Sequence, residues 1–274
     1  MKKISVFVLC FFLLSAALCA CSQGQTPAVT EAVTTEATTL PPETKALIDT
    51  EAALTEALQT TGMAVLDGDI ALTQQVVVRG GYLDGNGHSV TGPTYVEGTV
   101  ETENAVTVMG GTVKNISISG AYRGIGDSSA YRVNADVHLN NIWVDSQSYT
   151  LNFGYGTGST NLYVDNSTLL GWSSYTKFRE AFFTDCTFGW DTTGDSGNLR
   201  PYINTTLTGC KFEGKVNADG SVTPFNIKFK SGSSGILLVL EDCYVGDTLI
   251  TEENVSQLLG LDLQGNTLSI RNSR

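Results

Sequence analysis

The sequence predicts an all-β domain, folded as a parallel β-solenoid behind a short capping helix, and three observations lead to this prediction. Eight octets with one shared pattern recur between Val76 and Leu268. One place in every octet is held by a residue type that tolerates a left-handed backbone. Apolar residues alternate within the octets, as they do in strands, and do not follow the 3.6-residue period of helices.

The first residues have the layout of a secretory signal. Lys2 and Lys3 precede an apolar run, and Leu18-Cys19-Ala20-Cys21 resembles the end of a bacterial lipoprotein signal. The resemblance implies that residues 1–20 are removed and that Cys21 carries the lipid. The alternative is an uncleaved anchor helix. In both cases we expect an extracytoplasmic protein. If it is a lipoprotein, its lipid anchors it to the bacterial cell envelope.

A linker and a short helix should precede the solenoid. Residues 21–44 are rich in Thr, Glu and Ala and contain no aromatic residue, so we expect a disordered tether. Residues 45–274 should form a single domain. Its first element, a helix over 45–60 that ends before Gly62, should cover the first coil, whose strand edge would otherwise be exposed. Its apolar side chains on or near one face are Leu47, Ile48, Leu54 and Leu58.

The octets define the strands that follow. They are VVVRGGYL from Val76, GTVKNISI from Gly111, VHLNNIWV from Val137, LYVDNSTL from Leu162, AFFTDCTF from Ala181, TTLTGCKF from Thr205, LVLEDCYV from Leu238 and LDLQGNTL from Leu261. Their third and eighth places are always large and apolar, as inward-facing strand positions require. Their fifth place is always Gly, Asn or Asp, so each octet should be a strand, a left-handed bend and a second strand. The third-place residues are 19 to 35 positions apart, which predicts one coil per octet with loops of varying length.

Two segments carry a family resemblance. GGYLDGNGHSVTG, followed by GGTVKNISISG, resembles the opening coils of right-handed parallel β-helix proteins of the pectate-lyase-like superfamily. The likeness covers roughly Ala64 to the C-terminus and implies a right-handed parallel β-helix. It does not specify the chemistry, because that group includes lyases, hydrolases, esterases, adhesins and phage tailspikes.

Three cysteines share the sixth place of their octets. This place should point inward, so Cys186, Cys210 and Cys243 should stack as small buried side chains beside Ser167 and Asn266. The alternative is one disulfide within the column. Metal ligands would have to converge from different directions, which stacked side chains do not. We therefore predict no metal site and no cofactor.

The sequence offers no convincing catalytic group. Gly194-Asp195-Ser196-Gly197 matches the segment around a protease serine, but neither His88 nor His138 has the surroundings of a catalytic base. Resemblance to β-helix hydrolases should bring an Asp-Asp pair, a Gly-His-Gly and an Arg-Ile-Lys, and none of them occurs. Three aspartates remain as candidates without an identified partner: Asp145, Asp191 and Asp195.

Exposed aromatic residues suggest a binding surface instead. Trp143 holds an outward seventh place, and Trp172 and Trp190 follow the next two octets, so the three rings should lie along one side of the solenoid. Tyr175 and Lys211 should lie near them. Ring faces pack against the apolar faces of sugars. The alternative is that these rings fold over the turns and cover loop backbone.

Charge limits the choice of partner. The formal net charge is −12, so nucleic acid and anionic lipid headgroups should be repelled, and the membrane should be reached only through the N-terminal lipid. We therefore expect a surface lipoprotein whose β-helix binds a carbohydrate or another extracellular ligand without catalysis. One alternative is a polysaccharide lyase or glycoside hydrolase of the same architecture. A second is a structural or adhesive spacer that recognises another protein.

Overall fold

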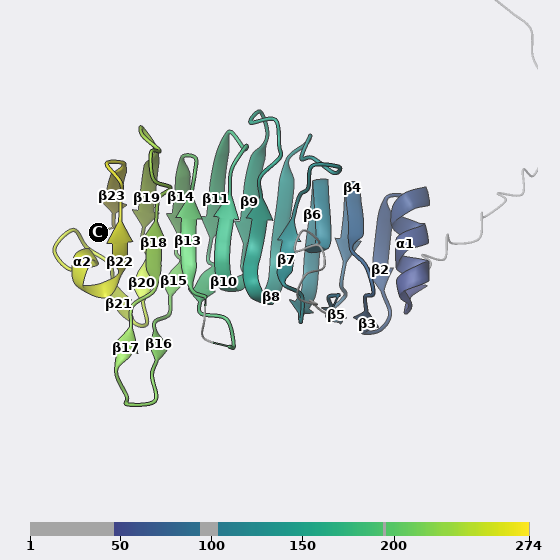
Figure 1. Cartoon of the computed structure of the whole chain (residues 1–274), viewed down its shortest axis with the longest axis horizontal. Coiled ribbons are helices and arrows are strands. Elements are labelled where there is room, and N and C mark those ends of the chain that lie inside the picture. Colours follow the sequence, from purple (N-terminus) through teal and green to yellow (C-terminus); the bar gives the residue numbers. More distant parts are fainter. Residues whose placement is uncertain (1–46, 94–103, 194–195, 274) are drawn as a thin grey trace, which may run out of the picture. The chain divides into compact units, whose positions relative to one another are not determined.

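The computed structural model describes residues 47–93, 104–193 and 196–273, all within the unit Thr44–Arg274. The fold is all-β: these residues form one large, mostly parallel sheet, a small hairpin and two short helices (Figure 1). The predicted signal over 1–20, the tether over 21–44 and the lipid site at Cys21 lie outside the described residues. In the described part of the chain, no helix has the length and hydrophobicity that a membrane crossing requires.

The parallel strands stack in three ladders. Ladder 1 contains β2 (Met63–Leu66), the end of β4 (Val76–Asp84), the middle of β6 (Asn104–Ser119), the start of β8 (Val137–Phe153), β9 (Asn161–Asp165), β11 (Glu180–Thr184), β14 (Thr205–Thr208), β19 (Leu237–Glu241) and β23 (Thr267–Arg271). Ladder 2 contains β3 (Ile70–Ala71), β5 (Ser89–Thr91), later parts of β6 and β8, the start of β10 (Thr168–Tyr175), β12 (Thr187–Gly189), β15 (Lys211–Phe212) and β20 (Tyr244–Val245). Ladder 3 contains the starts of β4 and β6, β7 (Arg123–Gly126), the ends of β8 and β10, β13 (Asn198–Pro201), β18 (Asn226–Lys228) and β22 (Gly260–Asp262).

A few elements lie outside the three ladders. They are β1 (Leu47–Ile48), which pairs with β2, the antiparallel hairpin of β16 (Lys215–Val216) and β17 (Val222–Thr223), β21 (Thr248–Leu249) against β20, and the short helix α2 (Val255–Leu258). The β16–β17 hairpin projects away from the large sheet (Figure 1). Its two valines, Val216 and Val222, are paired across the hairpin and exposed.

Six of the eight octets stack in the predicted register. From the octet at Gly111 to the octet at Leu238, third-place residues pair with third-place residues on ladder 1, for example Phe183 with Leu207. Eighth-place residues pair likewise on ladder 2, for example Leu169 with Phe188. The third-place side chains are fully buried and the seventh-place ones lie outward, as strand alternation requires.

The first and last octets are placed differently from the prediction. Val76 pairs with Val106 on ladder 3 and Leu83 with Val113 on ladder 1, so the first octet joins ladder 3 to ladder 1. The last octet does the same, because Leu261 pairs with Ile227 on ladder 3 while Leu268 pairs with Leu238 on ladder 1. Both corners require a bend followed by a strand, so the two octets show the same sequence pattern at a different place in the fold.

The bends are left-handed at every predicted position. Positive φ angles occur at all eight fifth places, which are Gly80, Asn115, Asn141, Asn166, Asp185, Gly209, Asp242 and Gly265. The asparagines also connect neighbouring strand layers: Asn141 donates through Nδ2 to Asn115 Oδ1 (2.9 Å), and Asn115 donates through Nδ2 to Asp84 Oδ1 (3.1 Å). Backbone geometry and side-chain hydrogen bonds therefore both favour these residue types.

The predicted helix is present but shorter at its start. Helix α1 spans Glu51–Thr60, with Thr50 as N-cap accepting a hydrogen bond from the Ala53 backbone N–H (3.3 Å). Leu54 and Leu58 are buried as predicted, and Gly62 follows the helix end with φ of +71°. Leu47 and Ile48 are not helical, because they form β1 and pair with Val65 and Leu66 of β2.

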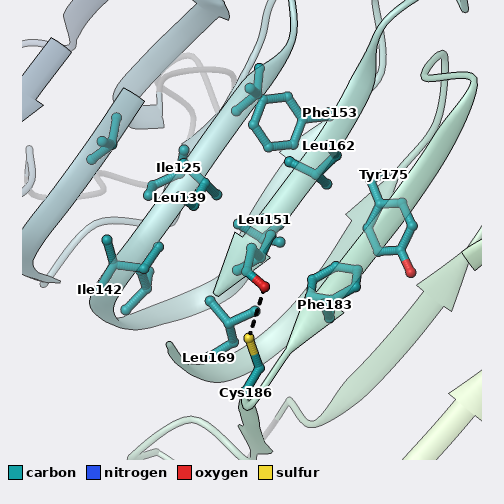
Figure 2. Close-up of a cluster of buried hydrophobic side chains, with 14 of the residues drawn as sticks. Ile125, Leu139, Ile142, Leu151, Phe153, Leu162, Leu169, Tyr175, Phe183 and Cys186 are labelled. Carbon is teal, nitrogen blue, oxygen red and sulfur yellow. Dashed lines mark hydrogen bonds between the residues drawn. The ribbon is translucent and has the colours of Figure 1, made fainter. Parts of the chain in front are cut away.

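The core lies between the ladders. Inward rows of aliphatic side chains continue from strand to strand, and larger rings fill the middle of the stack (Figure 2). Phe183, Phe188 and Phe212 are all buried, with neighbouring ring centroids 5.3 to 5.4 Å apart. This packing holds the outward side chains of each ladder in fixed positions.

Candidate ligand-binding surface

The predicted binding residues do not form one strip. Trp143 and Lys211 lie in the same outward row of ladder 2, separated by Thr168 and Thr187. Trp172 lies on ladder 3, where it pairs with Tyr149 and Asn198. The prediction placed all three tryptophans on one side, and it is wrong because the chain bends at Gly171 (φ of +126°), between the ladder 2 and ladder 3 parts of β10.

Tyr175 is not a surface residue. Its side chain lies among the buried core side chains (Figure 2). Its hydroxyl group lies 3.2 Å from Thr205 Oγ1. Burial also raises the pKa of Tyr175. The prediction that it contributes to ligand binding is therefore wrong: strand alternation in β10 turns position 175 inward, on the same side as the buried Ser173.

Trp190 packs against its own loop. Its ring lies so close to Gly197 that a Cβ there would approach it to 2.4 Å, and the Lys215 ammonium group lies 5.7 Å from the ring centroid. The indole N–H is buried without a hydrogen-bond partner among the described residues. Trp190 thus covers loop backbone, as the alternative reading expected.

Trp143 borders a shallow groove on ladder 2. The groove has a volume of about 220 Å³ and is lined by Gly87, Asn115, Ile116, Ser117, Asn141, Ile142, Trp143, Asn166 and Thr168. Its polar side chains include the bend asparagines, two of which already hydrogen-bond each other. The groove carries one aromatic ring and no charge.

The richest surface lies on the outward side of ladder 3, and we call it the Trp172 face. It consists of Tyr122, Arg123, Tyr149, Trp172, Arg200, Tyr202, Lys228 and Lys230, all of them at least partly exposed. At its centre, Tyr149 meets Trp172 edge-on at a centroid distance of 5.1 Å. The Arg200 guanidinium carbon lies 4.0 Å from the Trp172 centroid. A cation over a ring is attracted by the ring's quadrupole, so this arrangement is held in place.

Cations pair with rings along the rest of the face. Arg123 lies 5.9 Å from the Tyr122 ring and 5.6 Å from the Tyr149 ring. Lys230 lies 5.7 Å from the Tyr202 ring. A hollow of about 240 Å³ at this end is lined by Arg200, Tyr202, Lys228, Phe229, Lys230, Ser231, Asp262 and Gln264. The face therefore combines flat rings, positive charge and a recess.

Several polar groups in the ladder 3 row that contains Trp172 lack partners among the described residues. Buried atoms without a hydrogen bond in the described structure include Arg123 Nε, Trp172 Nε1 and Asn198 Oδ1. These three residues belong to one row of ladder 3, in which Arg123 pairs with Tyr149, Tyr149 with Trp172 and Trp172 with Asn198. Buried polar atoms are normally hydrogen-bonded, so three unpartnered polar atoms in one row of a sheet require an explanation.

The positive charges are also free of ion pairs. Within the described residues, no carboxylate lies within 4.0 Å of Arg123, Arg200, Lys228 or Lys230. Burial raises the pKa of Tyr149, while the charges of Arg200 and Arg123 act in the opposite direction, so both guanidinium groups influence this ring. The local field of the face is thus positive in an acidic protein.

The candidate catalytic groups take part in local structure. Asp145 accepts hydrogen bonds from the Thr192 backbone N–H (3.1 Å) and hydroxyl (2.7 Å), and Asp191 accepts one from the Thr193 hydroxyl (2.7 Å). Asp195 lies outside the described residues. His88 lies 3.6 Å from Asp69, and His138 stacks on Tyr163. No three His, Cys, Asp or Glu side chains in the described ranges are gathered so that they could hold a metal ion.

The three cysteines are free, buried and stacked as predicted. The thiols of Cys186, Cys210 and Cys243 lie 3.3, 3.5 and 3.4 Å from the carbonyl oxygens of Val164, Phe183 and Leu207 (Figure 2 shows the first). Interaction with the Cys186 thiol, together with burial, raises the pKa of Cys210.

Of the two residues predicted to lie beside the cysteine column, one lies there and the other does not. Ser167 lies beside Cys186, as the Thr187 N–H to Ser167 carbonyl hydrogen bond shows. Asn266 does not, because the shifted last octet places it against Ser233 and the Ile236 N–H. The prediction for Asn266 is wrong for the same reason as the register of its octet.

Most residues of the Trp172 face were missed from the sequence. The ladder 3 segments that carry them are short and share no fixed pattern of the length that the octets have. One signal was present, because inward residues alternate with rings or cations in four segments. They are SYTLNF from Ser148, GWSSY from Gly171, NLRPY from Asn198 and NIKFK from Asn226. Comparison of the chain with protein-family models, curated proteins and solved structures found no match.

Proposed function

We propose that the chain is a lipid-anchored surface protein of the bacterial envelope whose right-handed parallel β-helix binds a carbohydrate on the Trp172 face, without catalysis. The observation that carries the binding proposal is the Tyr149–Trp172–Arg200 cluster, where two rings and a guanidinium group are held together on a rigid outward surface. Rings pack on the apolar faces of sugars, and the fixed cation orients hydroxyl or carboxyl groups.

Three features support the solenoid architecture. Each of the three ladders runs through successive segments of the chain in sequence order, all in parallel. Each middle octet turns from ladder 1 to ladder 2 at one left-handed residue. A coil that returns to the same three ladders is what a parallel β-helix requires, and the handedness follows the strong preference of parallel crossover connections.

The unpaired charges favour an acidic sugar. Four cations without carboxylate partners would pair with carboxylate or sulfate groups, and the unpartnered polar atoms of the same row would gain hydrogen bonds. Net charge elsewhere on the protein repels polyanions in general, so recognition should depend on this face and not on the overall field.

One experiment separates binding from catalysis. The full-length protein is applied to an array of neutral and acidic glycans, and any glycan that is retained is incubated with it and analysed for reducing or unsaturated ends. We expect retention of acidic glycans with no product. Product formation would establish the polysaccharide lyase or glycoside hydrolase alternative, and a failure to retain any glycan would remove the carbohydrate proposal.

A further inference from the structure

A third pocket, separate from the groove beside Trp143 and from the hollow on the Trp172 face, lies where helix α1 meets ladder 3. It has a volume of about 160 Å³ and is lined by Thr55, Leu58, Gln59, Gln74, Gln75, Val76, Val77, Arg79 and Tyr131. Leu58 and Val76 are buried and form an apolar floor. Thr55 and Gln59 come from the helix, Gln74 and Gln75 from the loop before β4, Arg79 from β4 itself, and Tyr131 from the loop after β7.

Arg79 is the only charged side chain among the described residues that line the pocket. Its guanidinium carbon lies 4.7 Å from the centroid of the Tyr131 ring, and Nη1 lies 3.5 Å from Met109 Sδ. Among the described residues no carboxylate lies within 4.0 Å of it. The guanidinium group is therefore held over a ring by weak contacts, while its strong N–H donors have no anionic partner in the described part of the chain.

The other polar groups in the pocket can all donate hydrogen bonds. Gln75 uses its amide oxygen to accept from the Thr107 hydroxyl (2.6 Å), which leaves its Nε2 hydrogens for a ligand. Gln59 and Gln74 add two more amides. Among the described residues, no acidic side chain lines the pocket, so an acceptor with negative charge fits it better than a cation.

An independent observation also indicates a ligand. Thr55 Oγ1 is buried and has no hydrogen-bond partner in the described structure, although it lies in a helix where it could bond to a backbone carbonyl. Burying a hydroxyl without a partner is costly. A ligand atom in the pocket would give this hydroxyl its missing hydrogen bond.

We propose that this pocket binds the carboxylate of a small monoanionic ligand, with Arg79 as the charged anchor and Thr55 and Gln75 as hydrogen-bonding partners. One guanidinium group matches one carboxylate in charge and in planar, two-point geometry. Since a cavity of about 150 Å³ holds a molecule the size of benzene, the bound part has roughly six to ten non-hydrogen atoms. Two sources share this chemistry: a small acyl amino acid and a uronic acid sugar.

The test uses matched probes with the full-length protein. N-Acetylalanine is compared with its amide, and galacturonate with galactose, by calorimetric titration and by saturation-transfer NMR. We expect at least one acid to bind saturably and its neutral counterpart to bind about tenfold more weakly or worse, because the charge-assisted hydrogen bonds are lost. The acid that binds more tightly identifies the source.

Variants locate the site. Arg79→Gln should weaken binding about tenfold, Arg79→Lys should weaken it less, and Thr55→Val should weaken it severalfold while circular dichroism stays unchanged. Arg132→Gln is the matched control, because Arg132 is an exposed arginine of the loop that contains Tyr131, is absent from the lining of the pocket, and donates to the Ser129 carbonyl. It should leave the affinity unchanged.

Three results would overturn the proposal. They are equal affinity for the acid and for its neutral counterpart, an equal loss of affinity in Arg132→Gln and Arg79→Gln, and no saturable binding of either acid. The Trp172→Ala variant keeps this test separate from the proposed glycan binding. It should bind the small acid normally, and loss of the acid in that variant would place it on the Trp172 face and contradict a site at Arg79.

Discussion

At the scale of single residues, the bends depend on side chains that make a left-handed backbone inexpensive. The left-handed conformation costs most residues about 1–2 kcal/mol of free energy, and it costs Gly, Asn and Asp less. Asn141 adds a hydrogen bond to Asn115, which in turn bonds Asp84. This preference explains why the eight bends could be predicted from residue type alone.

Replacement of Asn141 tests this account. Asn141→Ala should lower the free energy of unfolding by about 1–2 kcal/mol, because alanine fits φ of +50° poorly and cannot bond Asn115. Asn141→Gly should cost less, since glycine removes only the hydrogen bond. Asn140→Ala is the matched control, and chemical denaturation should show a change within about 0.5 kcal/mol. An equal decrease in the free energy of unfolding in all three variants would contradict this explanation of the bends.

The cysteine column predicts a pattern of thiol reactivity. Cys186, Cys210 and Cys243 are buried, and the pKa values of Cys210 and Cys243 are raised by the neighbouring thiols and by burial. Since the thiolate is the reactive form, we expect no alkylation of these residues in the folded protein at pH 8. Peptide mapping should find all three alkylated after denaturation without reductant. A disulfide-linked peptide from this column would contradict the stacking of free thiols.

At the scale of elements, six octets could be assigned their correct register from the sequence and two could not. For the first octet the reason is local: Leu83 does end a strand–bend–strand unit, but its partner in the next layer is Val113, and the ladder 1 to ladder 2 corner follows at Asn86 and Gly87. That corner is longer than the others, so GYLDGNGHSV does not match an eight-residue pattern. Fixed-length patterns miss corners with insertions.

Helix α1 should be needed to close the first strand layer. Leu54 is fully buried, and α1 contacts both β2 and β4. Leu54→Ala should therefore reduce the free energy of unfolding by about 2–5 kcal/mol, as expected for a core leucine. Ala52→Ser, on the exposed side of the helix, is the control. Thermal unfolding of both variants measures the difference, and an unchanged melting temperature in Leu54→Ala would show that α1 does not stabilise the sheet.

The loop after β7 should respond to pH through Asp127. This buried carboxylate accepts hydrogen bonds from the Gly154 and Tyr155 backbone N–H groups (2.6 and 2.8 Å), yet burial raises its pKa. A raised pKa in the folded state means that stability from this group is present at low pH and is lost as pH rises through that pKa.

Asp127→Asn isolates this effect. The stability of the wild type relative to Asp127→Asn should decrease as pH rises from below the usual aspartate pKa of about 4 to neutral pH. Urea unfolding at a series of pH values measures it, and contributions from all other groups cancel in the difference. A wild-type advantage that increases with pH would mean that the two N–H bonds outweigh burial.

At the scale of the whole molecule, ladder 3 was the part that the sequence did not reveal. Its strands are short, and their register is fixed by the ladders on either side and not by a repeating pattern of their own. Arg123, Arg200 and Lys230 come from distant parts of the chain, so only stacking places them on one surface. The single tryptophan of this face, Trp172, was recognised as a binding candidate, but its partners depended on the three-dimensional arrangement.

The charge distribution follows the same architecture. Four cations without a carboxylate partner among the described residues gather on one ladder of a protein with a net charge of −12, and three of them lie over aromatic rings. A group of positive charges on an acidic protein predicts salt-sensitive binding of an acidic glycan, with affinity falling as ionic strength rises. Affinity that does not change between low and high salt would indicate a neutral ligand on the same rings.

The measurement that tests the central claim most directly is a calorimetric titration of a retained glycan against two tryptophan variants. Trp172→Ala should weaken binding about tenfold or more, as truncation of a central aromatic anchor does, while Trp143→Ala, a partly exposed tryptophan on ladder 2, should leave the affinity unchanged. Circular dichroism confirms that both variants fold. Retained affinity in Trp172→Ala together with loss in Trp143→Ala would contradict the assignment of binding to the Trp172 face.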